Sequence, residues 1–388
     1  MLIGEHQVDE FTLEVFDSIN DLDVELWNTA FADGHPFKTH GFIQACEQVF
    51  PHRQYRFLCF RTSRSSLPLG LLFATQEKVD LFANAGGYMQ VLLRTLRSRW
   101  PLFGRLAVAV LGSYETSGQH WWFSDVIATD RHISLINCAL TLAFPRARLR
   151  VIRDLVHQDN DSDLNRQLQA FRFHQVASYP LAQIPLHGRS WAEHSLRLKA
   201  NGRKNLNRRM TQLRQSNWRI VHYREPLQSF ELLYELYLNT HRQASEFKRE
   251  ALPIEFFERV LQLCSVVVSV LYDLQDRVYA FIFSGVSDTI INPFIFGRDY
   301  RSNSEVNAYY VLHIDLIQRF SSHNTQSIDL GITNYFLKQN FGARLQRNDI
   351  YLKLSNPLLN ELFGRPLAKQ FSIPQPEERN VFKYDYQG

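Results

Sequence analysis

The sequence predicts a mixed α/β protein of the α+β kind, with two tandem domains that each hold a mixed, mostly antiparallel sheet flanked by helices. The chain has 388 residues, more than the roughly 250 to 300 that one hydrophobic core usually supports. Strand and helix patterns also follow one another in nearly the same order in the two halves. We therefore expect one domain over residues 1–187 and a second over residues 188–388.

The second half begins with three runs that are rich in β-branched and aromatic residues and are separated by the turn-forming segments DLQD and SD. Such runs predict an antiparallel meander. The chain then changes to a helical period, with apolar residues recurring on one face. The predicted segments are strands at 264–273, 277–288 and 289–300, a helix at 307–322, a strand at 326–332, a short helix at 335–342 and a strand at 348–355.

The first half repeats this order more loosely. Two paired strands and a later strand precede a helix, a strand, a second helix and a last strand. The predicted segments are strands at 54–61, 67–79 and 105–113, a helix at 132–144, a strand at 148–155, a helix at 163–175 and a strand at 181–186. The repeated order indicates a tandem of two related units, joined near residues 185–191.

Several classes of protein are disfavoured by the sequence. Its start, MLIGEHQVDEF, is acidic and lacks the basic end and apolar run of a signal peptide. No segment approaches the roughly 18 apolar residues of a membrane span, so we expect a cytoplasmic protein. The four cysteines are far apart in sequence and lack metal-binding spacing, so we expect reduced thiols. His35, His40 and His52 match no usual ligand spacing either, and we expect no metal.

Three segments carry a resemblance to a known family: HPFKTHGFIQACEQVF at 35–50, LRLKANGRKNLNRRMTQLRQSNW at 196–218 and IDLGITNYFLKQNFGARLQRN at 328–348. With the order of strands and helices, they resemble the GNAT acyltransferase superfamily, and within it the tandem-domain branch of Fem and FemAB-like proteins. The resemblance implies two GNAT-like domains around a cleft and transfer of an activated acyl group to an amine. Classical GNAT enzymes take the acyl group from acyl-CoA, whereas Fem enzymes take it from aminoacyl-tRNA.

The loop before the helix at 307–322 departs from the pattern of CoA-dependent GNAT proteins. Such proteins usually carry [QR]xxGx[GA] here, which offers backbone N–H groups to a pyrophosphate at a helix N-terminus. This chain has GRDYRSNSEVNAYY instead. Side chains are therefore expected to hold the phosphate groups of an acyl-CoA co-substrate. The candidates are Arg298, Arg301, Ser302, Asn303 and Ser304.

A basic helix is expected near residue 204. No acidic residue occurs between Glu193 and Glu225, although the segment contains many Lys and Arg residues. A solvated face is one reading, and a site for a CoA phosphate, a nucleotide-linked acceptor or tRNA is the other, because such a one-sided run repels itself. Arg203 and Lys204 are the substrate-binding candidates in this helix.

Lys338 is the principal catalytic candidate. Aminolysis of an ester or thioester passes through a tetrahedral oxyanion, which a nearby positive charge stabilises. In the Fem resemblance, the motif K-x-x-F-G-A falls on Lys338, Phe341, Gly342 and Ala343, and this lysine lines the substrate cleft. The alternative is a surface lysine whose stem covers Phe341.

The reaction also requires an acceptor for the amine proton. Asp329 ends a predicted strand, Tyr335 stands where GNAT enzymes often carry a general acid, and one of Tyr309 and Tyr310 is expected to face the cleft. Further candidates are Asp299 and Glu305. The sequence does not choose among them.

A polar helix end supplies candidates for binding the acceptor, which the resemblance suggests to be a small molecule or a cell-envelope amine. They are Asn239, His241 and Arg242. The same residues also fit a helix C-terminus favoured by the dipole.

Three functions remain open: an N-acyltransferase that uses acyl-CoA or a similar donor, a Fem-type aminoacyl-tRNA-dependent transferase, and a catalytically silent GNAT-like binding module. The changed phosphate loop favours the last, and the Lys338 motif favours the first two.

Overall fold

A computed structural model of the chain describes residues 1–31, 34–63, 65–80, 88–100, 104–156, 162–225, 230–244, 250–301 and 306–383. The chain forms two compact units, each made of separate stretches of sequence. Unit 1 comprises Met1–Ala30, Phe50–Ser178 and Asn348–Pro374. Unit 2 comprises Phe31–Val49, Tyr179–Arg347 and Gln375–Gly388.

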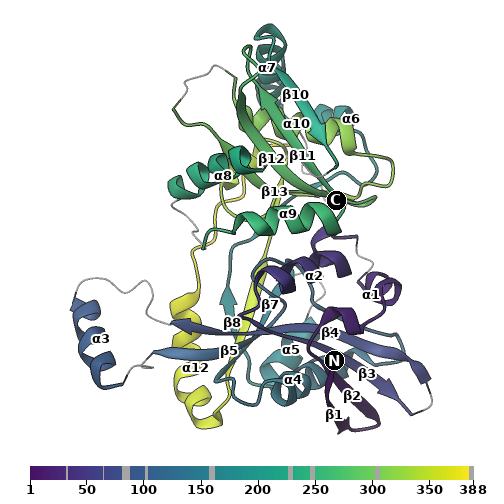
Figure 1. The fold of residues 1–388 in the computed structure, drawn as a ribbon, viewed down its shortest axis with the longest axis vertical. Coiled ribbons are helices and arrows are strands. Elements are labelled where there is room, and N and C mark those ends of the chain that lie inside the picture. The colour runs from purple at the N-terminus through teal and green to yellow at the C-terminus, as the bar shows by residue number, and fades with distance from the viewer. Residues whose placement is uncertain are drawn as a thin grey trace. The chain divides into compact units, whose positions relative to one another are not determined.

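Unit 1 is built on one large sheet (Figure 1). Its strands are β1 (Leu2–Val8), β2 (Phe11–Phe16), β3 (Gln54–Thr62), β4 (Ser65–Asp80), β5 (Arg105–Leu111), β6 (Trp121–Phe123), β7 (Leu149–Val156), β8 (His174–Ala177) and β16 (Asn348–Leu354). They lie in the order β1-β2-β3-β4-β5-β7-β16-β8, with β6 beside β4. β5 and β7 pair in parallel, and the other described pairs are antiparallel.

Helices lie on both faces of this sheet. The helices of the unit are α1 (Val24–Ala30), α3 (Tyr88–Arg99), α4 (His132–Ala143), α5 (Ser162–Ala170) and α12 (Pro357–Phe371), with short 3-10 turns η1 (Ile19–Asp21) and η3 (Thr129–Arg131). Of these, α3 lies beyond the ends of β4 and β5 and not on a face of the sheet (Figure 1). Ile136 and Leu140 of α4 are buried in the main core of the unit. Ala368 of α12 packs in a smaller cluster with Leu149 of β7 and Leu352 of β16. Other residues of these strands point the opposite way, into the core that contains α4. The helices α4 and α12 therefore cover opposite faces of the sheet.

Unit 2 has a second sheet. Its strands are β9 (Leu181–Pro185), β10 (Arg219–Tyr223), β11 (Val266–Tyr272), β12 (Val278–Val286), β13 (Ile290–Arg298), β14 (Ser327–Asp329) and β15 (Arg344–Gln346). Their order is β10-β11-β12-β13-β14-β9-β15. The strands β10 to β13 form an antiparallel meander, and β14 then pairs with β13 in parallel.

The helices of unit 2 also flank both faces of the sheet. They are η2 (Pro36–Lys38), α2 (His40–Val49), α6 (Trp191–Arg197), α7 (Ala200–Gln215), α8 (Glu231–Gln243), α9 (Ile254–Leu263), α10 (Ala308–Phe320) and α11 (Tyr335–Gln339). Ala280 and Ile282 of β12 share a core with α10. The alternate residue Phe283 points the other way and meets the ring of Phe257 in α9 at 5.5 Å between centroids.

The predicted fold class is confirmed, and the chain connects the units in a way that the sequence did not indicate. β9, the last strand of the first half, lies between β14 and β15 in the sheet of unit 2. β16, the last strand of the second half, lies between β7 and β8 in the sheet of unit 1. The compact units therefore differ from the continuous ranges 1–187 and 188–388, because each sheet takes its inserted strand from the other half of the sequence.

Two sequence expectations concern the class of protein. In the ranges that the structure describes, no helix combines the length and the apolar character that a bilayer span requires. The four cysteines are free thiols, with Cys46 and Cys59 buried and the other two partly buried.

Candidate active site

The candidate site begins where two strands of unit 2 separate. β13 and β14 pair only through Ile290 with Ser327 and Ile291 with Ile328. Asp329, the last residue of β14, pairs instead with Gln183 of β9. Asn292 of β13 still reaches across and donates a hydrogen bond from Nδ2 to the Asp329 carbonyl, at 3.0 Å. The side chains beyond this point lie between strands that no longer bond to each other.

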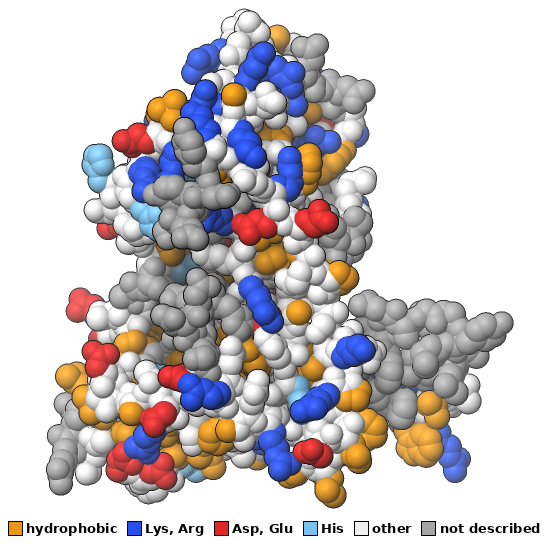
Figure 2. Space-filling view, turned by 180° about the vertical axis from the view of Figure 1, so that it is seen from behind, with side chains coloured by type: hydrophobic (Ala, Val, Ile, Leu, Met, Phe, Trp, Pro, Cys, Tyr) orange, Lys and Arg blue, Asp and Glu red, His pale blue; other side chains and the backbone are white. Residues whose placement is uncertain are grey.

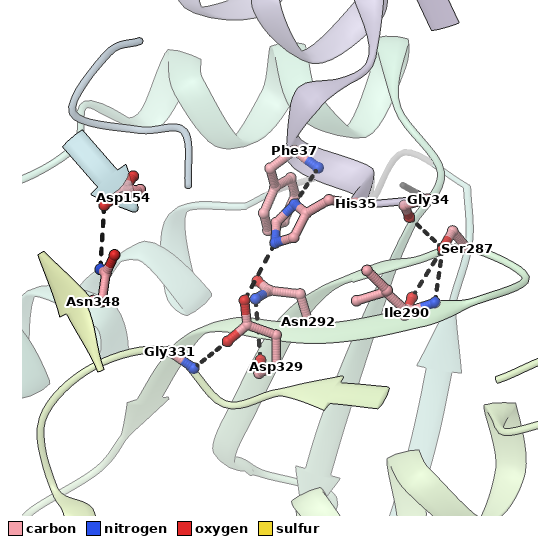
Figure 3. A network of polar contacts seen from close by, with 10 residues as sticks. All are labelled: Gly34, His35, Phe37, Asp154, Ser287, Ile290, Asn292, Asp329, Gly331 and Asn348. Carbon is pink, nitrogen blue, oxygen red and sulfur yellow. Dashed lines mark hydrogen bonds and ion pairs between the residues drawn. The ribbon is translucent and has the colours of Figure 1, made fainter. Parts of the chain in front are cut away.

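The Asp329 carboxylate is buried and held by two donors (Figure 3). Its Oδ1 accepts the Gly331 N–H at 2.7 Å, and its Oδ2 lies 3.3 Å from His35 Nε2. Because His35 Nδ1 accepts the Phe37 N–H at 3.2 Å, the proton of a neutral ring sits on Nε2, which donates to Asp329. Both nitrogens of this imidazole are therefore engaged.

Asp329 keeps its negative charge in spite of its burial. Burial alone raises the pKa of a carboxyl group. In Asp329 the hydrogen bond from His35, the bond from Gly331 and the nearby charge of Lys338 outweigh that effect and hold its pKa below the ordinary value. The site thus contains an ionised carboxylate that water does not solvate freely.

Lys338 lies on α11 with only 5% of its surface exposed. Its ammonium donates a hydrogen bond to the Ile332 carbonyl. The connecting loop is held in a costly shape, because Thr333 and Asn334 both have positive φ angles, of 63° and 50°. The side chain is therefore a buried cation next to Asp329, and not the surface lysine of the alternative reading.

His313 and Tyr309, one turn apart on α10, form the other side of this group. His313 Nδ1 donates to the Tyr309 carbonyl at 2.6 Å. Burial, and to a smaller extent the charge of Lys338, lowers the pKa of His313 to about 4, so the ring is neutral. Its Nε2 accepts no hydrogen bond within the described ranges.

Tyr309 presents a protonated phenol. Burial raises its pKa well above the ordinary value, and the neighbouring Tyr310 adds to the shift. The ring packs 4.1 Å from the His313 ring and 5.4 Å from the Phe296 ring. Its hydroxyl group has no hydrogen-bond partner in the part of the chain that the structure describes. Tyr310 is buried in the core of the unit, and Tyr309 packs against the same core.

The predicted phosphate-binding residues are described only in part. Ser302, Asn303 and Ser304, with the alternative Glu305, lie outside the described residues. The Arg298 guanidinium stacks 4.1 Å from the centre of the Tyr300 ring, and its buried Nε has no acceptor among the described residues. Arg301 is exposed and pairs with Asp299 at 3.1 Å.

The polar end of α8 adjoins the end of β13. The Arg298 N–H donates to the Thr240 hydroxyl at 3.2 Å. Arg242 Nη1 donates to Asn239 Oδ1 at 3.2 Å, and the His241 ring lies 5.9 Å from the Tyr237 ring. The structure thus brings the predicted acceptor-binding helix end to the predicted phosphate-binding strand end.

Three other candidates lie elsewhere. Tyr335 donates its hydroxyl proton to the Pro180 carbonyl at 2.9 Å, so its phenol is already engaged. Arg203 and Lys204 lie on α7, whose five described cations form no ion pair with an acidic side chain of the described ranges. Figure 2 shows Lys and Arg side chains gathered over the part of unit 2 that carries α7.

His35, His313 and Asn292 are the polar residues of this site that the sequence did not single out for catalysis. His35 lies 294 residues from Asp329 in the sequence. The available signal was the position of His35 at the start of the HPFK segment. From the sequence, however, this histidine is weighed only as a possible metal ligand. In the described residues, no group of three His, Cys, Asp or Glu side chains could hold a metal ion.

Comparisons with known proteins agree with this architecture. Residues 200–339 match the family described as acetyltransferase (GNAT) domain. No curated protein matches the chain in sequence.

Three solved structures share the fold. The structure of FemX aligns with a TM-score of 0.60 and 9% identity over 89% of this chain and 99% of FemX. A putative lysylphosphatidylglycerol synthetase C-terminal domain from Agrobacterium fabrum aligns with a TM-score of 0.55 and 11% identity, over 89% of this chain and 95% of that domain. A tandem GNAT protein from the clavulanic acid biosynthesis pathway aligns with a TM-score of 0.52 and 8% identity, over 89% of this chain and 99% of that protein.

The family match identifies a GNAT acetyltransferase domain over residues 200–339, and the structural alignments show that the whole chain has a fold shared with a tandem GNAT protein. The fold is also that of FemX, in agreement with the resemblance to Fem proteins that the sequence predicted.

Proposed function

We propose that unit 2 transfers an acyl group from acyl-CoA or a similar activated donor to an amine. The observation that carries the proposal is the buried Lys338, which lies within electrostatic reach of both Asp329 and His313. A buried ammonium ion is costly unless it is compensated by hydrogen bonds and nearby negative charge. Its placement where the strands separate suits a group that waits for a developing oxyanion.

The proposed reaction assigns a task to each side chain. The acceptor amine attacks the acyl carbonyl carbon, forming the new C–N bond, and the Lys338 ammonium stabilises the resulting oxyanion. Asp329, ionised at neutral pH, accepts the proton released from the amine. As the tetrahedral intermediate collapses, the bond to the leaving sulfur or oxygen breaks, and the Tyr309 phenol protonates the leaving group.

His35 acts on this reaction through Asp329. With both ring nitrogens in hydrogen bonds, it has no free lone pair to serve as a base. Its Nε2–H instead fixes the carboxylate orientation and supports the charged form. His35 is therefore a positioning residue in the proposal.

The donor is tested first by calorimetric titration of the purified chain with acetyl-CoA and with a long-chain acyl-CoA. Saturable binding that weakens in an Arg298→Gln variant supports acyl-CoA, because an unpartnered guanidinium is suited to a phosphate. Lys338→Ala should retain this binding and lose thiol release in a screen of amine acceptors. Full turnover in Lys338→Ala would contradict the assignment, and binding without turnover for any amine would favour a silent module.

A second donor, aminoacyl-tRNA, is favoured by the cations of α7, which form no ion pair with an acidic side chain of the described ranges. Binding of charged tRNA through this helix should weaken steeply as salt rises, through counterion release. An Arg203→Gln, Lys204→Gln double variant should reduce the slope of log Kd against log salt by about two, one for each lost phosphate contact. A flat salt dependence, or activity that survives RNase treatment, would exclude this donor. With either donor, the amine acceptor would be a small molecule or a cell-envelope precursor, as the Fem resemblance suggests.

A further inference from the structure

The helix α12 of unit 1 is attached to its sheet by small and polar residues. Asn360, Gly364 and Ala368, spaced four residues apart, are the buried positions of the helix. Asn360 accepts the Leu354 N–H at 2.9 Å and donates to the Arg172 carbonyl at 2.9 Å. A Cβ atom on Gly364 would lie 2.2 Å from His174 Nε2, so this glycine allows the helix to approach β8 closely.

The end of the helix is fixed as well. Ser372, its C-cap, accepts the Ala177 N–H of β8 at 3.1 Å through its hydroxyl, and the following Ile373 N–H donates to the Ala177 carbonyl at 3.0 Å. Contacts along the helix run to β8 and β16 (Figure 1). α12 is therefore anchored at both ends and presents a defined outer face.

That outer face is apolar, which inverts the usual arrangement of a surface helix. Leu358, Leu359, Leu362 and Phe363 are exposed by 75%, 47%, 66% and 55%. Leu362 and Phe363 lie one turn after Leu358 and Leu359, so the four form two adjacent rows. A helix that buries Asn and Gly while exposing Leu and Phe indicates that something else covers its outer face.

The charges beside this face identify the kind of partner. Arg365 and Lys369 follow Leu358 and Leu362 by seven residues, or two turns, and so lie on the same side of the helix. Both are exposed and form no ion pair with an acidic residue of the described ranges. The one acidic residue of α12, Glu361, already pairs with Arg172 at 2.9 Å.

These observations lead us to propose that α12 binds the surface of an anionic phospholipid bilayer, with Leu358, Leu359, Leu362 and Phe363 inserted among the acyl chains near the headgroups. Arg365 and Lys369 then meet the lipid phosphates. Helices with Leu and Phe on one face and Arg or Lys beside it bind in this way. A contact between two copies of the chain is less well matched, because it would double the unpaired cations without adding a free carboxylate.

The test is co-sedimentation of the full chain with vesicles, either of phosphatidylcholine alone or of equal parts phosphatidylcholine and phosphatidylglycerol. The wild type should bind the anionic vesicles, more weakly so at high salt. Leu362→Glu with Phe363→Glu should weaken binding by about a hundredfold, since two apolar side chains are lost from the membrane. Arg365→Gln with Lys369→Gln should weaken it by about thirtyfold on anionic vesicles only.

A matched control uses exposed apolar residues outside α12. Leu67→Glu with Val126→Glu, at positions of unit 1 that are similarly exposed, should leave vesicle binding unchanged. Circular dichroism checks that each variant folds. Absence of wild-type binding, or equal binding by the Leu362, Phe363 variant, overturns the proposal. So does a wild-type dimer in sedimentation velocity that this variant dissociates, because a second copy then covers the face.

Discussion

The two units place an aspartate at comparable points and treat it differently. In each, the strand that follows the central helix, β7 after α4 and β14 after α10, pairs in parallel with an earlier strand of its unit, β5 and β13 respectively. Asp154 of β7 lies 2.9 Å from Arg153 Nε and accepts from Asn348 Nδ2 at 3.3 Å (Figure 3). Asp329 of β14 accepts from the His35 imidazole and a backbone N–H.

The different partners indicate which of the two carboxylates, Asp154 or Asp329, is available for chemistry. A guanidinium stays charged at every working pH, so Arg153 neutralises Asp154 within unit 1. Asp329 has no guanidinium partner among the described residues: it accepts from His35 and the Gly331 N–H, and the nearby Lys338 ammonium, which also lowers its pKa, donates to the Ile332 carbonyl. We therefore expect unit 2 to hold the reacting groups and unit 1 to use its aspartate for structure.

The largest effect should come from exchanging each carboxylate for an amide. Asp329→Asn should lower turnover by about a thousandfold, within the range for loss of a positioned acid or base. Asp154→Asn should leave turnover within about threefold and lower stability instead, because it leaves Arg153 without its partner. Product formation from the donor identified by calorimetry measures the first, and urea unfolding the second. Equal losses of turnover would remove the distinction between the units.

The pH dependence of stability should be dominated by unit 2. Burial lowers the pKa of His194 and of His313 to about 4, from an ordinary value of 6.5. Between these values the unfolded state binds more protons, so the unfolding free energy falls as the pH drops from 6.5 toward 4. The loss should reach about 3 kcal/mol for each histidine.

Urea unfolding at pH 7 and pH 5 measures this dependence. His313→Gln should remove about half of this dependence, since one of the two buried imidazoles is lost and His194 still titrates. An unchanged slope in that variant would show that the buried ring is not the group that titrates.

Two glycines in unit 2 test why the K-x-x-F-G-A motif carries a glycine. Gly342 has a φ of 84°, and a Cβ there would lie 2.6 Å from His194 Nε2. Gly342→Ala should therefore cost about 2 kcal/mol, from backbone strain and crowding together. Gly202, inside α7, has no atom within 4 Å of an added Cβ, and Gly202→Ala should stabilise by about 0.5 to 1 kcal/mol. Thermal unfolding of both variants checks the contrast.

Among the residues of the candidate site, the smallest expected loss of turnover concerns His35. His35→Ala should lower kcat by about tenfold with little change in KM, because it only frees the Asp329 carboxylate to reorient, while most of the transition-state contacts remain. His35→Gln, whose amide can still donate a hydrogen bond, should recover part of this loss. The Asp329 pKa should rise without its donor, so the pH below which kcat falls should be higher in His35→Ala than in the wild type. Such a change would support the positioning role. A purely structural role would leave that pH unchanged.

The sequence predicted the order of elements well because that order depends on local patterns. The meander at β11 to β13 and the helix α10 follow from runs of β-branched residues and from helical spacing. It did not predict β1, whose LIGEHQV alternates weakly and lies at an edge of the sheet. It also did not predict α12, whose Gly364 and Pro366 read as helix breakers.

For the site, local motifs identified Lys338 and Asp329 as candidates, and the rest depended on long-range packing. The sequence gives no measure of burial for a lysine between aromatic residues, and it offered five alternatives for the proton acceptor. Among the candidate acids and bases, only the fold showed that the Tyr335 phenol is engaged with Pro180, whereas the Tyr309 phenol has no partner in the described ranges.

By itself, the sequence determined the two-unit α/β architecture, the GNAT resemblance and a lysine at the end of a strand, because periodicity and short motifs depend only on neighbouring residues. The tertiary structure alone decided that β9 and β16 each enter the sheet made by the other half. It also decided that His35 meets a carboxylate 294 residues away. Strand pairing and buried polar contacts join residues that are distant in sequence, and the choice of partner depends on the whole packed core.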